Sequence, residues 1–341
     1  MNSRDIWLLC AGVVAVAILG LPRKAEEKAS PAPPAAVTER VEKPTPTPIH
    51  ADVAPAESVA TTAPEPLAAP EISPELRGLL TRLRGTFEGR GSKPNRFRLQ
   101  RQLSELWGDH PPVDVLLFEA SDPEAPSKYR AHFAARLRNL GKTAPPEQRE
   151  ELAHAMRESL ARQPQGNFQL AQALLAFDQQ PANVRAVSAP LESPLPDDTT
   201  AGLLAALALS GSTESRHIRL EHTRSISSDP DRFPLALQAS LPPLALRPEL
   251  EVGPILHHVL SNTSHFPLYE TAVESCFYRP PGSATLAALQ VAVARRTEFD
   301  VDEQERLTQR IRAGLLRHSR QVATSQPSIH EGIETLLSQL Q

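Results

Sequence analysis

The stretch Ser73–Phe87, SPELRGLLTRLRGTF, is the first segment of the 341-residue chain with the pattern of a helix in a folded domain. Ser73 suits a helix cap, Pro74 suits the first turn, and Glu75 lies near the positive end of the helix dipole. Four leucines and Phe87 then recur at the spacing of one helix face. The segment predicts that a helical domain begins at residue 73.

Helical periodicity continues from this segment to the end of the chain. Ser328 and Glu331 have the spacing of a capping box, and apolar residues fill one face after them. Val113–Phe118 is typical of a short strand, but no second strand is evident to pair with it. We therefore expect residues 73–341 to form one all-α domain. Further helices are expected near residues 96–107, 127–140, 146–162, 167–178, 198–210, 232–241, 249–261, 267–277, 283–297 and 302–318.

The positions of the prolines predict how these helices are joined. Of the 34 prolines, 22 follow Glu75, mostly in clusters such as Pro111-Pro112 and Pro242-Pro243. A proline in a helix interior costs about 3 kcal/mol, so such clusters indicate helix ends. We therefore expect helices of about 10–18 residues joined by short turns into antiparallel hairpins.

A short sequence that recurs within the domain indicates an internal repeat. The tripeptide Phe-Pro-Leu at 233–235 recurs at 266–268, in each case with an alanine four residues later, and Phe168 and Leu170 begin a related helix. Residues 167–318 thus resemble HEAT-type helical repeats, which pair two helices per unit and serve mainly as scaffolds. No HEAT consensus is matched. The resemblance implies an irregular HEAT-like α-solenoid; an irregular helical domain with a chance Phe-Pro-Leu pair is the alternative.

Residues 6–21, IWLLCAGVVAVAILGL, form an uncharged apolar run. A membrane-spanning helix needs about 20 residues and a secretory signal core about 7–15, so the run lies between the two. The small-x-small sequence 15–17 lies inside the run rather than after it, and Leu8-Leu9 before Cys10 argue against lipidation. We expect residues 1–21 to be a signal anchor with one transmembrane helix; a cleaved signal peptide that releases a secreted helical protein is the alternative.

Charges beside this run bear on its orientation. Arg4 precedes it, whereas Arg23, Lys24 and Lys28 follow it, which favours a cytoplasmic C-terminal side by the positive-inside rule. However, a short tail with one arginine is typical of a signal sequence, and long downstream domains translocate largely regardless of charge. We therefore expect a single-pass, membrane-anchored protein with its helical domain on the periplasmic or extracytoplasmic side.

Residues 22–72 have the composition of a linker. They contain no aromatic residue and no glycine, and prolines recur in runs such as SPAPPAA and KPTPTP. Such a segment cannot bury enough apolar surface to offset its ordering entropy, so we expect a disordered Pro/Ala/Glu-rich linker. Its proline content favours a semi-rigid stalk with a reach of about 40 Å as a coil and about 150 Å fully extended. A proline-motif ligand is the alternative interpretation.

No motif in the chain predicts catalysis, a cofactor or a metal. Two cysteines exclude a disulfide framework and a four-cysteine zinc site, and the chain has no glycine-rich phosphate loop. The adjacent His257-His258 would point about 100° apart on a helix and could not chelate one ion from one face. Cys276 is expected to be a buried structural thiol. We expect the acidic pairs Asp197-Asp198 and Asp300–Asp302 to cap helices.

One cluster of charge stands out against the near-neutral composition, which has a formal net charge of −4. Between residues 77 and 101 the net charge is +7, with Glu88 as the single acid. We call these eight cations the basic cluster: Arg77, Arg82, Arg84, Arg90, Lys93, Arg96, Arg98 and Arg101. They are candidates for binding an acidic protein surface, a cell-wall polyanion or anionic lipid. A solvated helix face whose arginines pair with acids of the same domain is the alternative.

Together these patterns favour a protein without catalytic chemistry. We expect a membrane-tethered helical scaffold or protein-interaction domain, held off the bilayer by its stalk and contacting a protein partner through the helical domain. An all-α enzyme with an unrecognised active site is the alternative. Nucleic acid is an unlikely partner because the pI is near 6.3 and aromatic residues in the basic cluster are sparse. Reversing the charges of Arg96 and Arg98 is expected to weaken partner binding with little effect on thermal stability.

Overall fold

The computed structural model describes residues 69–108, 111–163 and 167–340. Within these ranges the chain forms fifteen α-helices and two short 3-10 helices, with no strand, so the all-α prediction is confirmed. The α-helices are α2 (Pro74–Phe87), α3 (Lys93–Trp107), α4 (Val113–Ser121), α5 (Ser127–Thr143), α6 (Pro146–Ala161), α7 (Phe168–Phe177), α8 (Pro181–Ser188), α9 (Asp197–Leu209), α10 (Thr213–Ile226), α11 (Pro234–Ala245), α12 (Gly253–Asn262), α13 (Phe266–Cys276), α14 (Ser283–Arg295), α15 (Val301–Val322) and α16 (Pro327–Ser338). The 3-10 helices are η1 (Ala189–Glu192) and η2 (Arg296–Glu298).

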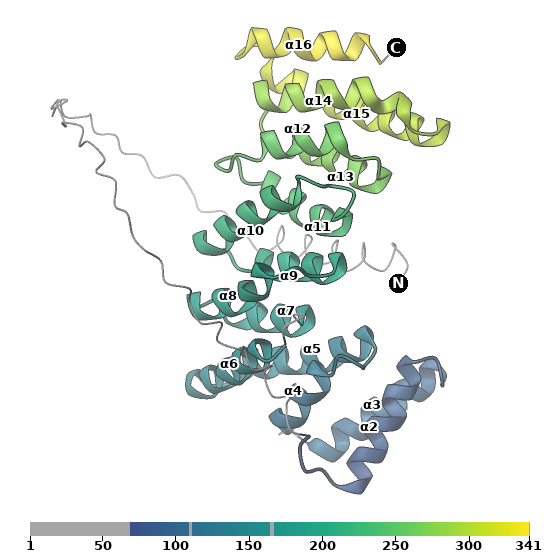
Figure 1. Ribbon diagram of the computed structural model, residues 1–341, viewed down its shortest axis with the longest axis vertical. Coiled ribbons are helices and arrows are strands. Elements are labelled where there is room, and N and C mark those ends of the chain that lie inside the picture. Colours follow the sequence, from purple (N-terminus) through teal and green to yellow (C-terminus); the bar gives the residue numbers. More distant parts are fainter. Residues whose placement is uncertain (1–68, 109–110, 164–166, 341) are drawn as a thin grey trace, which may run out of the picture.

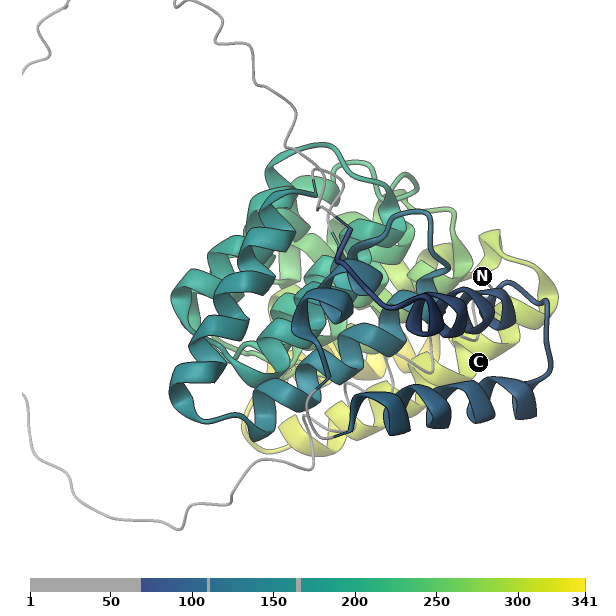
Figure 2. The same ribbon diagram turned by 90° about the horizontal axis from the view of Figure 1, so that it is seen from below.

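The helices follow one another along the long axis in chain order, from α2 and α3 at one end to α16 at the other (Figure 1). Helices α5, α7, α9, α11 and α13 each pack against the next member of this series. A second series runs beside it, in which α6 packs on α8, and α12 on α14. Seen along the stack, α2 and α3 lie side by side at its near end (Figure 2). Apart from α2 and α3, most helices therefore have neighbours on two or more sides.

Several helix ends follow the sequence signals. The Leu76 amide donates to Ser73 Oγ at 3.2 Å, with Pro74 in the first turn, as predicted. Asp300 caps α15 by accepting from the Glu303 amide at 2.8 Å. The prediction of a capping box at Ser328 is wrong, because α16 already begins at Pro327 and no side chain caps it. Proline suits a first helical turn, which moves the start of the helix ahead of Ser328.

Three expectations about local structure are corrected. Val113–Phe118 belongs to α4, whose buried side chains pack on α5; a short apolar run suits a buried helix as well as a strand. Pro242-Pro243 lies inside α11 rather than at its end, because the helix buries residues on both sides of the pair and continues to Ala245. Helices α8 and α10 were not predicted, and the inward face of α10 carries polar residues that hide its periodicity.

Asp197 caps a neighbouring helix rather than its own. Its two carboxylate oxygens accept from the amides of Leu235 and Ala236, both at 2.9 Å, at the start of α11. The first turn of α9, where Asp197 lies, has no side-chain cap. Asp198 instead accepts from the Thr199 amide at 2.7 Å. The carboxylate of Asp197 therefore joins the starts of two adjacent helices.

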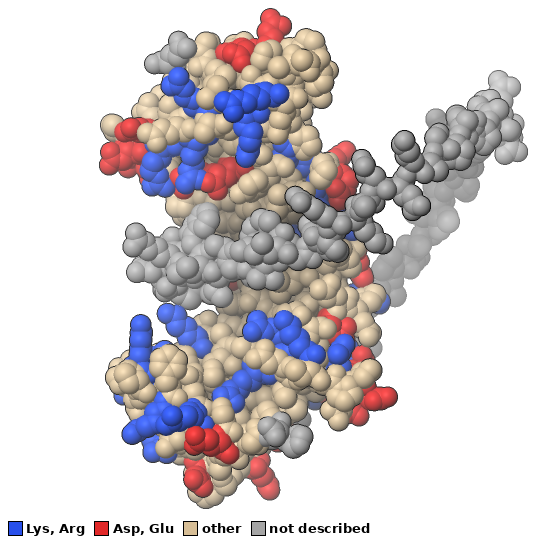
Figure 3. Space-filling view, turned by 180° about the vertical axis from the view of Figure 1, so that it is seen from behind, with Lys and Arg blue, Asp and Glu red and all other residues tan. Residues whose placement is uncertain are grey.

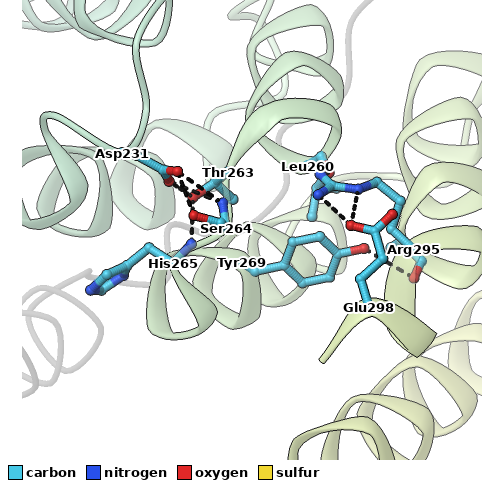
Figure 4. Close-up of polar contacts among 9 residues, drawn as sticks. Asp231, Leu260, Thr263, Ser264, His265, Tyr269, Arg295 and Glu298 are labelled. Carbon is cyan, nitrogen blue, oxygen red and sulfur yellow. Dashed lines mark hydrogen bonds and ion pairs between the residues drawn. The ribbon is translucent and has the colours of Figure 1, made fainter. Parts of the chain in front are cut away.

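A second acid makes a similar joint two helices further on (Figure 4). Asp231, in the turn between α10 and α11, accepts from Thr263 Oγ1 and Ser264 Oγ, each at 2.6 Å, before α13. Burial acts to raise the pKa of Asp231, but hydrogen bonds from Ser264 and Thr263 outweigh it and hold the pKa below its usual range. The loops before α11 and α13 are thus held together by charge-assisted hydrogen bonds.

An arginine makes a further joint close to this one, at the C-terminal end of α12 (Figure 4). Arg295, at the end of α14, donates to the carbonyl of Leu260 in α12 at 2.6 Å and to Glu298 Oε2 at 2.6 Å. Tyr269 of α13 donates to the carbonyl of Ala292 at 3.1 Å. These bonds satisfy carbonyls at helix C-termini, which have no partner within their own helix.

Glycines allow two of the closest helix contacts. A Cβ on Gly202 of α9 would lie 2.2 Å from Cγ of Phe168, at the start of α7. A Cβ on Gly314 of α15 would lie 2.3 Å from the ring of Phe277, after α13. Aromatic rings therefore occupy the space that a side chain on either helix would need.

The predicted membrane anchor at 6–21 and most of the predicted linker at 22–72 lie outside the described residues. Residues 69–72, the last part of the linker, lead into Ser73 and α2 without helical structure. Across the described ranges, none of the helices combines the length and apolar character that crossing a membrane requires. Helix α2 begins at Pro74, directly after its cap Ser73.

Candidate interaction surface

The basic cluster lies on the hairpin of α2 and α3. The two helices pack through leucines, including Leu83 on α2 and Leu99 and Leu103 on α3, each 2 % exposed or less. Ser92 caps α3 by accepting from the Asn95 amide at 3.4 Å. Gly89, in the turn between them, has a φ of 89°, a conformation that favours glycine. The remaining faces of both helices are left for charged side chains.

Aromatic residues attach this hairpin to α5. The ring of Phe87, at the end of α2, meets Tyr129 edge-on at a centroid distance of 5.6 Å. Trp107, at the end of α3, lies 6.3 Å from Phe133, and the Arg136 guanidinium lies over its ring at 5.1 Å. The hairpin is therefore joined to the stack by a small group of rings at both ends.

His132 lies within this joint. Its Nδ1 is 3.2 Å from the side-chain amide nitrogen, Nε2, of Gln100 on α3. The other ring nitrogen of His132 is buried without a hydrogen-bond partner. Burial, followed by the positive charge of Arg136, lowers the pKa of His132 to about 4. The imidazole is therefore neutral at physiological pH.

One member of the basic cluster reaches outside the hairpin to an acid. Arg84 Nη1 lies 2.5 Å from Asp122, in the turn after α4, and its Nε lies 3.4 Å from Glu88. Close by, Tyr129 donates to Glu119 at 2.7 Å. Burial raises the pKa of Glu119, and this effect is larger than the lowering caused by the hydrogen bond from Tyr129. Arg84 thus supports the joint between α2 and α4 rather than an exposed surface.

Arg96 is also a structural residue. Its Nη2 donates to the carbonyl of Thr86 at 2.6 Å, its Nε to Thr86 Oγ1 at 3.3 Å, and its guanidinium lies over the Phe87 ring at 4.1 Å. It therefore closes the C-terminal end of α2, where carbonyls need donors. Reversing its charge would break these contacts, so the expectation of unchanged thermal stability is withdrawn for Arg96 and kept for Arg98.

Two further members pair within the hairpin. Arg90 forms an ion pair with Glu88, and Arg101 lies 3.6 Å from Glu105 one turn along α3. The arginine side chains of both pairs are about three-quarters exposed, at 74 % and 75 %. Such surface pairs contribute little to stability, and solvent weakens them.

The other four cations have no acidic partner among the described residues: Arg77, Arg82, Lys93 and Arg98. Arg82 donates only to the carbonyl of Gly78 at 3.2 Å, and Arg98 to the side chain of Asn95 at 3.0 Å. All four are exposed. We call them the unpaired cations; they form the part of the basic cluster that is free to bind an anion.

An exposed aromatic ring accompanies them. Phe97, between Arg96 and Arg98 on α3, is 68 % exposed, whereas Phe87 is half-buried beneath Arg96. Seen from behind, Lys and Arg side chains gather at the end of the molecule where α2 and α3 lie (Figure 3). The surface therefore combines positive charge with one large apolar side chain, both typical of binding sites.

The residues considered for catalysis or metal binding are not brought together. Cys276 is fully buried, and burial raises the pKa of its thiol to about 12, which confirms the expected structural role. His257 and His258 are exposed on α12. In the described part of the chain, no three His, Cys, Asp or Glu side chains are placed to hold a metal ion.

Sequence reasoning missed three side chains that are buried or half-buried. His132 and Trp107 were not singled out, because a histidine in a polar stretch gives no sign of the rings that surround it. Arg219 of α10 is 3 % exposed and was also missed, since an arginine is normally assigned to the surface. In each case the signal arises only when helices from different parts of the chain meet.

Comparison with known proteins gives no family. No family model matches the chain, and no curated protein or solved structure is similar to it.

Proposed function

We propose that this protein is a single-pass, membrane-tethered helical scaffold whose α2–α3 hairpin binds an acidic surface of a protein partner. In this proposal residues 6–21 form the anchor and residues 22–72 the spacer. The helical domain acts on the extracytoplasmic side. It performs no catalysis.

We further propose that the helical domain is an irregular HEAT-like α-solenoid. Support comes from the contacts between alternate helices, which run from α5 to α13 in one series and join α6 to α8 and α12 to α14 beside it. The two Phe-Pro-Leu sequences stand at the starts of α11 and α13, which pack on each other. Polar joints link positions about one helix pair apart, such as Asp231 to Ser264 and Gln179 to the carbonyl of Leu209. Solenoids of this kind serve mainly as binding scaffolds.

The observation that carries the binding proposal is the set of unpaired cations on the α2–α3 hairpin, together with exposed Phe97 on α3. Exposed charges without partners contribute little to the stability of a fold, whereas they raise the rate and selectivity of association with an oppositely charged surface. An exposed aromatic ring adds apolar area that becomes buried on binding. An acidic protein surface that also offers an apolar contact fits both features.

A matched pair of double variants tests this proposal. The first variant, Arg77→Glu with Arg98→Glu, reverses two of the four unpaired cations. The second, Arg312→Glu with Arg320→Glu, makes the same change of charge at exposed positions of α15. We expect the first pair to abolish binding of the full chain to labelled polyglutamate, measured by fluorescence anisotropy, and the second pair to preserve it. Crosslinking in intact membranes should then capture a partner with the control variant but not with the hairpin variant.

A protease-protection experiment with the wild type distinguishes a protein partner from lipid. In nanodiscs of phosphatidylcholine, trypsin should cleave the hairpin after Arg77 and Arg98. If added phosphatidylglycerol protected those sites, the ligand would be the bilayer and the protein-partner proposal would fail. Equal polyglutamate binding by both double variants would also refute it.

The proposed orientation has its own test. Cys276 is buried, so a cysteine introduced at exposed Ser325 provides a new labelling site on the helical domain. We expect a membrane-impermeant maleimide to label Ser325→Cys in intact cells. Labelling only after lysis would place the domain in the cytoplasm.

A further inference from the structure

Helix α10 presents a polar face to the interior. Its buried positions are Ser215, Arg219, Thr223 and Ile226, one helical turn apart along a single stripe. Ser215 is satisfied, because its hydroxyl donates to the carbonyl of Leu207 at 2.5 Å. Arg219 and Thr223 are not: Arg219 Nε and Nη2 and Thr223 Oγ1 are buried without a hydrogen-bond partner. Three unsatisfied polar atoms therefore lie along one face of one helix.

The charge on Arg219 has no counter-ion among the described residues. The side chain is 3 % exposed, and no acid of the described ranges forms an ion pair with it. The charge that acts on the Arg219 guanidinium is that of Arg247, which has the same sign. Burial, together with the charge of Arg247, lowers the pKa of Arg219 to about 10, so the guanidinium remains charged at physiological pH.

The acids near this site are engaged elsewhere. Glu249 pairs with Arg216 at 3.1 Å, and Glu214 lies 3.4 Å from Arg185 of α8. Glu221 points to His217 at 3.1 Å on the exposed face of α10. Neutralisation of Arg219 by the domain itself is therefore not observed in the described residues, although buried charges in proteins are normally paired.

The position of Arg219 gives the direction from which an anion would arrive. Long side chains on a helix lean toward its N-terminus. At the N-terminal end of α10, Arg216 forms an ion pair with Glu249, which lies in the turn between α11 and α12. Arg247 belongs to the same turn. Arg247 and Glu249 are exposed, and Leu246 beside them is 45 % exposed. The ion pair between Arg216 and Glu249 thus ties the exposed turn at 246–252 to the N-terminal half of α10.

We propose that Arg219, with Thr223 and Arg247, forms a binding site for an oxyanion, either a carboxylate or a phosphate group. A guanidinium offers a fork of donors that matches the two oxygens of such a group, and Nε and Nη2 form one side of that fork. Thr223 Oγ1 supplies a further donor, and Arg247 supplies a second positive charge. This site lies on α10 and the turn after α11 and is separate from the α2–α3 hairpin.

Thermal unfolding of the full chain in neutral detergent tests this proposal. Sodium phosphate and sodium glutarate are compared with sodium chloride at equal ionic strength. We expect one of the two oxyanions to raise the unfolding midpoint of the wild type by about 3 °C more than chloride does. Arg219→Met should abolish this rise, whereas Arg224→Met, at an exposed position of the same helix, should retain it.

The pattern across the two oxyanions identifies the ligand chemistry. A rise with glutarate alone assigns a carboxylate, as on an acidic side chain of a partner, and a rise with phosphate alone assigns a phosphate ester. Without added anion, Arg219→Met should unfold at or above the wild-type midpoint, because it removes an unpaired buried charge. Should that variant fail to fold, Arg247→Met takes its place and is expected to reduce the rise.

Two results would overturn the proposal. The first is a wild-type midpoint that neither oxyanion raises beyond the effect of chloride. The second is an equal rise in wild type and Arg219→Met, which would show that the anion acts elsewhere.

Discussion

The α2–α3 hairpin and helix α9 are both helical, but they differ in how many of their residues are buried. In α3 only Leu99 and Leu103 are buried, and charged side chains occupy the other faces. In α9, by contrast, seven of thirteen residues are buried, because α7, α8, α10 and α11 all pack against it. The hairpin touches the stack mainly through α5. Surplus charge therefore accumulates where a helix has few neighbours.

This difference also determines what a polar residue does in each region. Within the stack, Asp197 and Asp231 each join the ends of two adjacent helices. On the hairpin, Arg98 and Lys93 reach no acid in the described ranges. These two acids of the stack thus serve the fold, whereas the unpaired cations of the hairpin make no contact with an acid in the described ranges. Four predictions test this contrast.

The largest expected effect is in the centre of the stack. Leu204→Ala in α9 removes a fully buried side chain and should lower the free energy of unfolding by about 2–5 kcal/mol. Leu106→Ala on α3, where the leucine is 43 % exposed, should change it by less than about 0.5 kcal/mol. Urea unfolding followed by circular dichroism measures both. Similar losses in the two variants would mean that the hairpin is packed as tightly as the stack.

Acidification is expected to release the hairpin. Because burial lowers the pKa of His132 to about 4, its neutral form stabilises the fold fully above the unfolded pKa near 6.5. That contribution, roughly 3 kcal/mol, is lost as the pH falls from about 6.5 to about 4. Trp107 reports on this joint, since Trp7→Phe leaves it as the single tryptophan. Its emission should shift to the red in this pH range.

His132→Gln is the control for acidification. It cannot gain a proton, so the red shift of Trp107 between pH 6.5 and 4 should disappear. A shift of equal size in this variant would assign the change to other groups; burial also lowers the pKa of His222 and of His318.

One substitution should have opposite signs in the two regions. Gly202→Ala in α9 would place a Cβ 2.2 Å from Phe168, and overpacking should destabilise the protein by about 1–3 kcal/mol despite the better helix propensity of alanine. Gly78→Ala on exposed α2 meets nothing within 4 Å, so it should stabilise by about 0.5–1 kcal/mol. Thermal or urea unfolding gives both signs. Stabilisation by Gly202→Ala would contradict the close contact.

The smallest effects separate two neighbouring arginines on the hairpin. Arg96→Ala loses the bonds to Thr86 and the contact with Phe87, and should destabilise by about 1–2 kcal/mol. Arg98→Ala should change the free energy of unfolding by less than about 0.5 kcal/mol. Conversely, Arg98→Ala should weaken polyglutamate binding. If the two variants lost equal stability, the division of the basic cluster into structural and unpaired members would be wrong.

The prediction from sequence succeeded where the signal is local. The Ser73 cap, the stripe of leucines on α2 and the buried Cys276 follow from residues within a few turns of one another. It failed where a helix derives its partners from elsewhere. α10 was missed because Arg219 and Thr223 occupy its inward face, and a polar residue at such a position looks like a residue on the surface.

The basic cluster shows the same division within one segment. Its eight cations could be found by charge alone, and their place on one hairpin follows from the helix signals around them. Arg84 and Arg96 could not be separated from the others by sequence. Asp122 lies 38 positions from Arg84, and the bonds of Arg96 depend on the turn that brings α3 back over the end of α2.

For this protein, the sequence by itself determined the helical character and the start of α2, because caps, prolines and apolar spacing act over a single helix. The position of the basic cluster followed in the same way. Only the tertiary structure decided which polar groups are satisfied. Asp197 capping α11, Arg96 closing α2 and Arg219 left unpaired all depend on how different helices pack together. A hydrogen bond or ion pair forms over a few ångströms, a distance that sequence separation does not reveal.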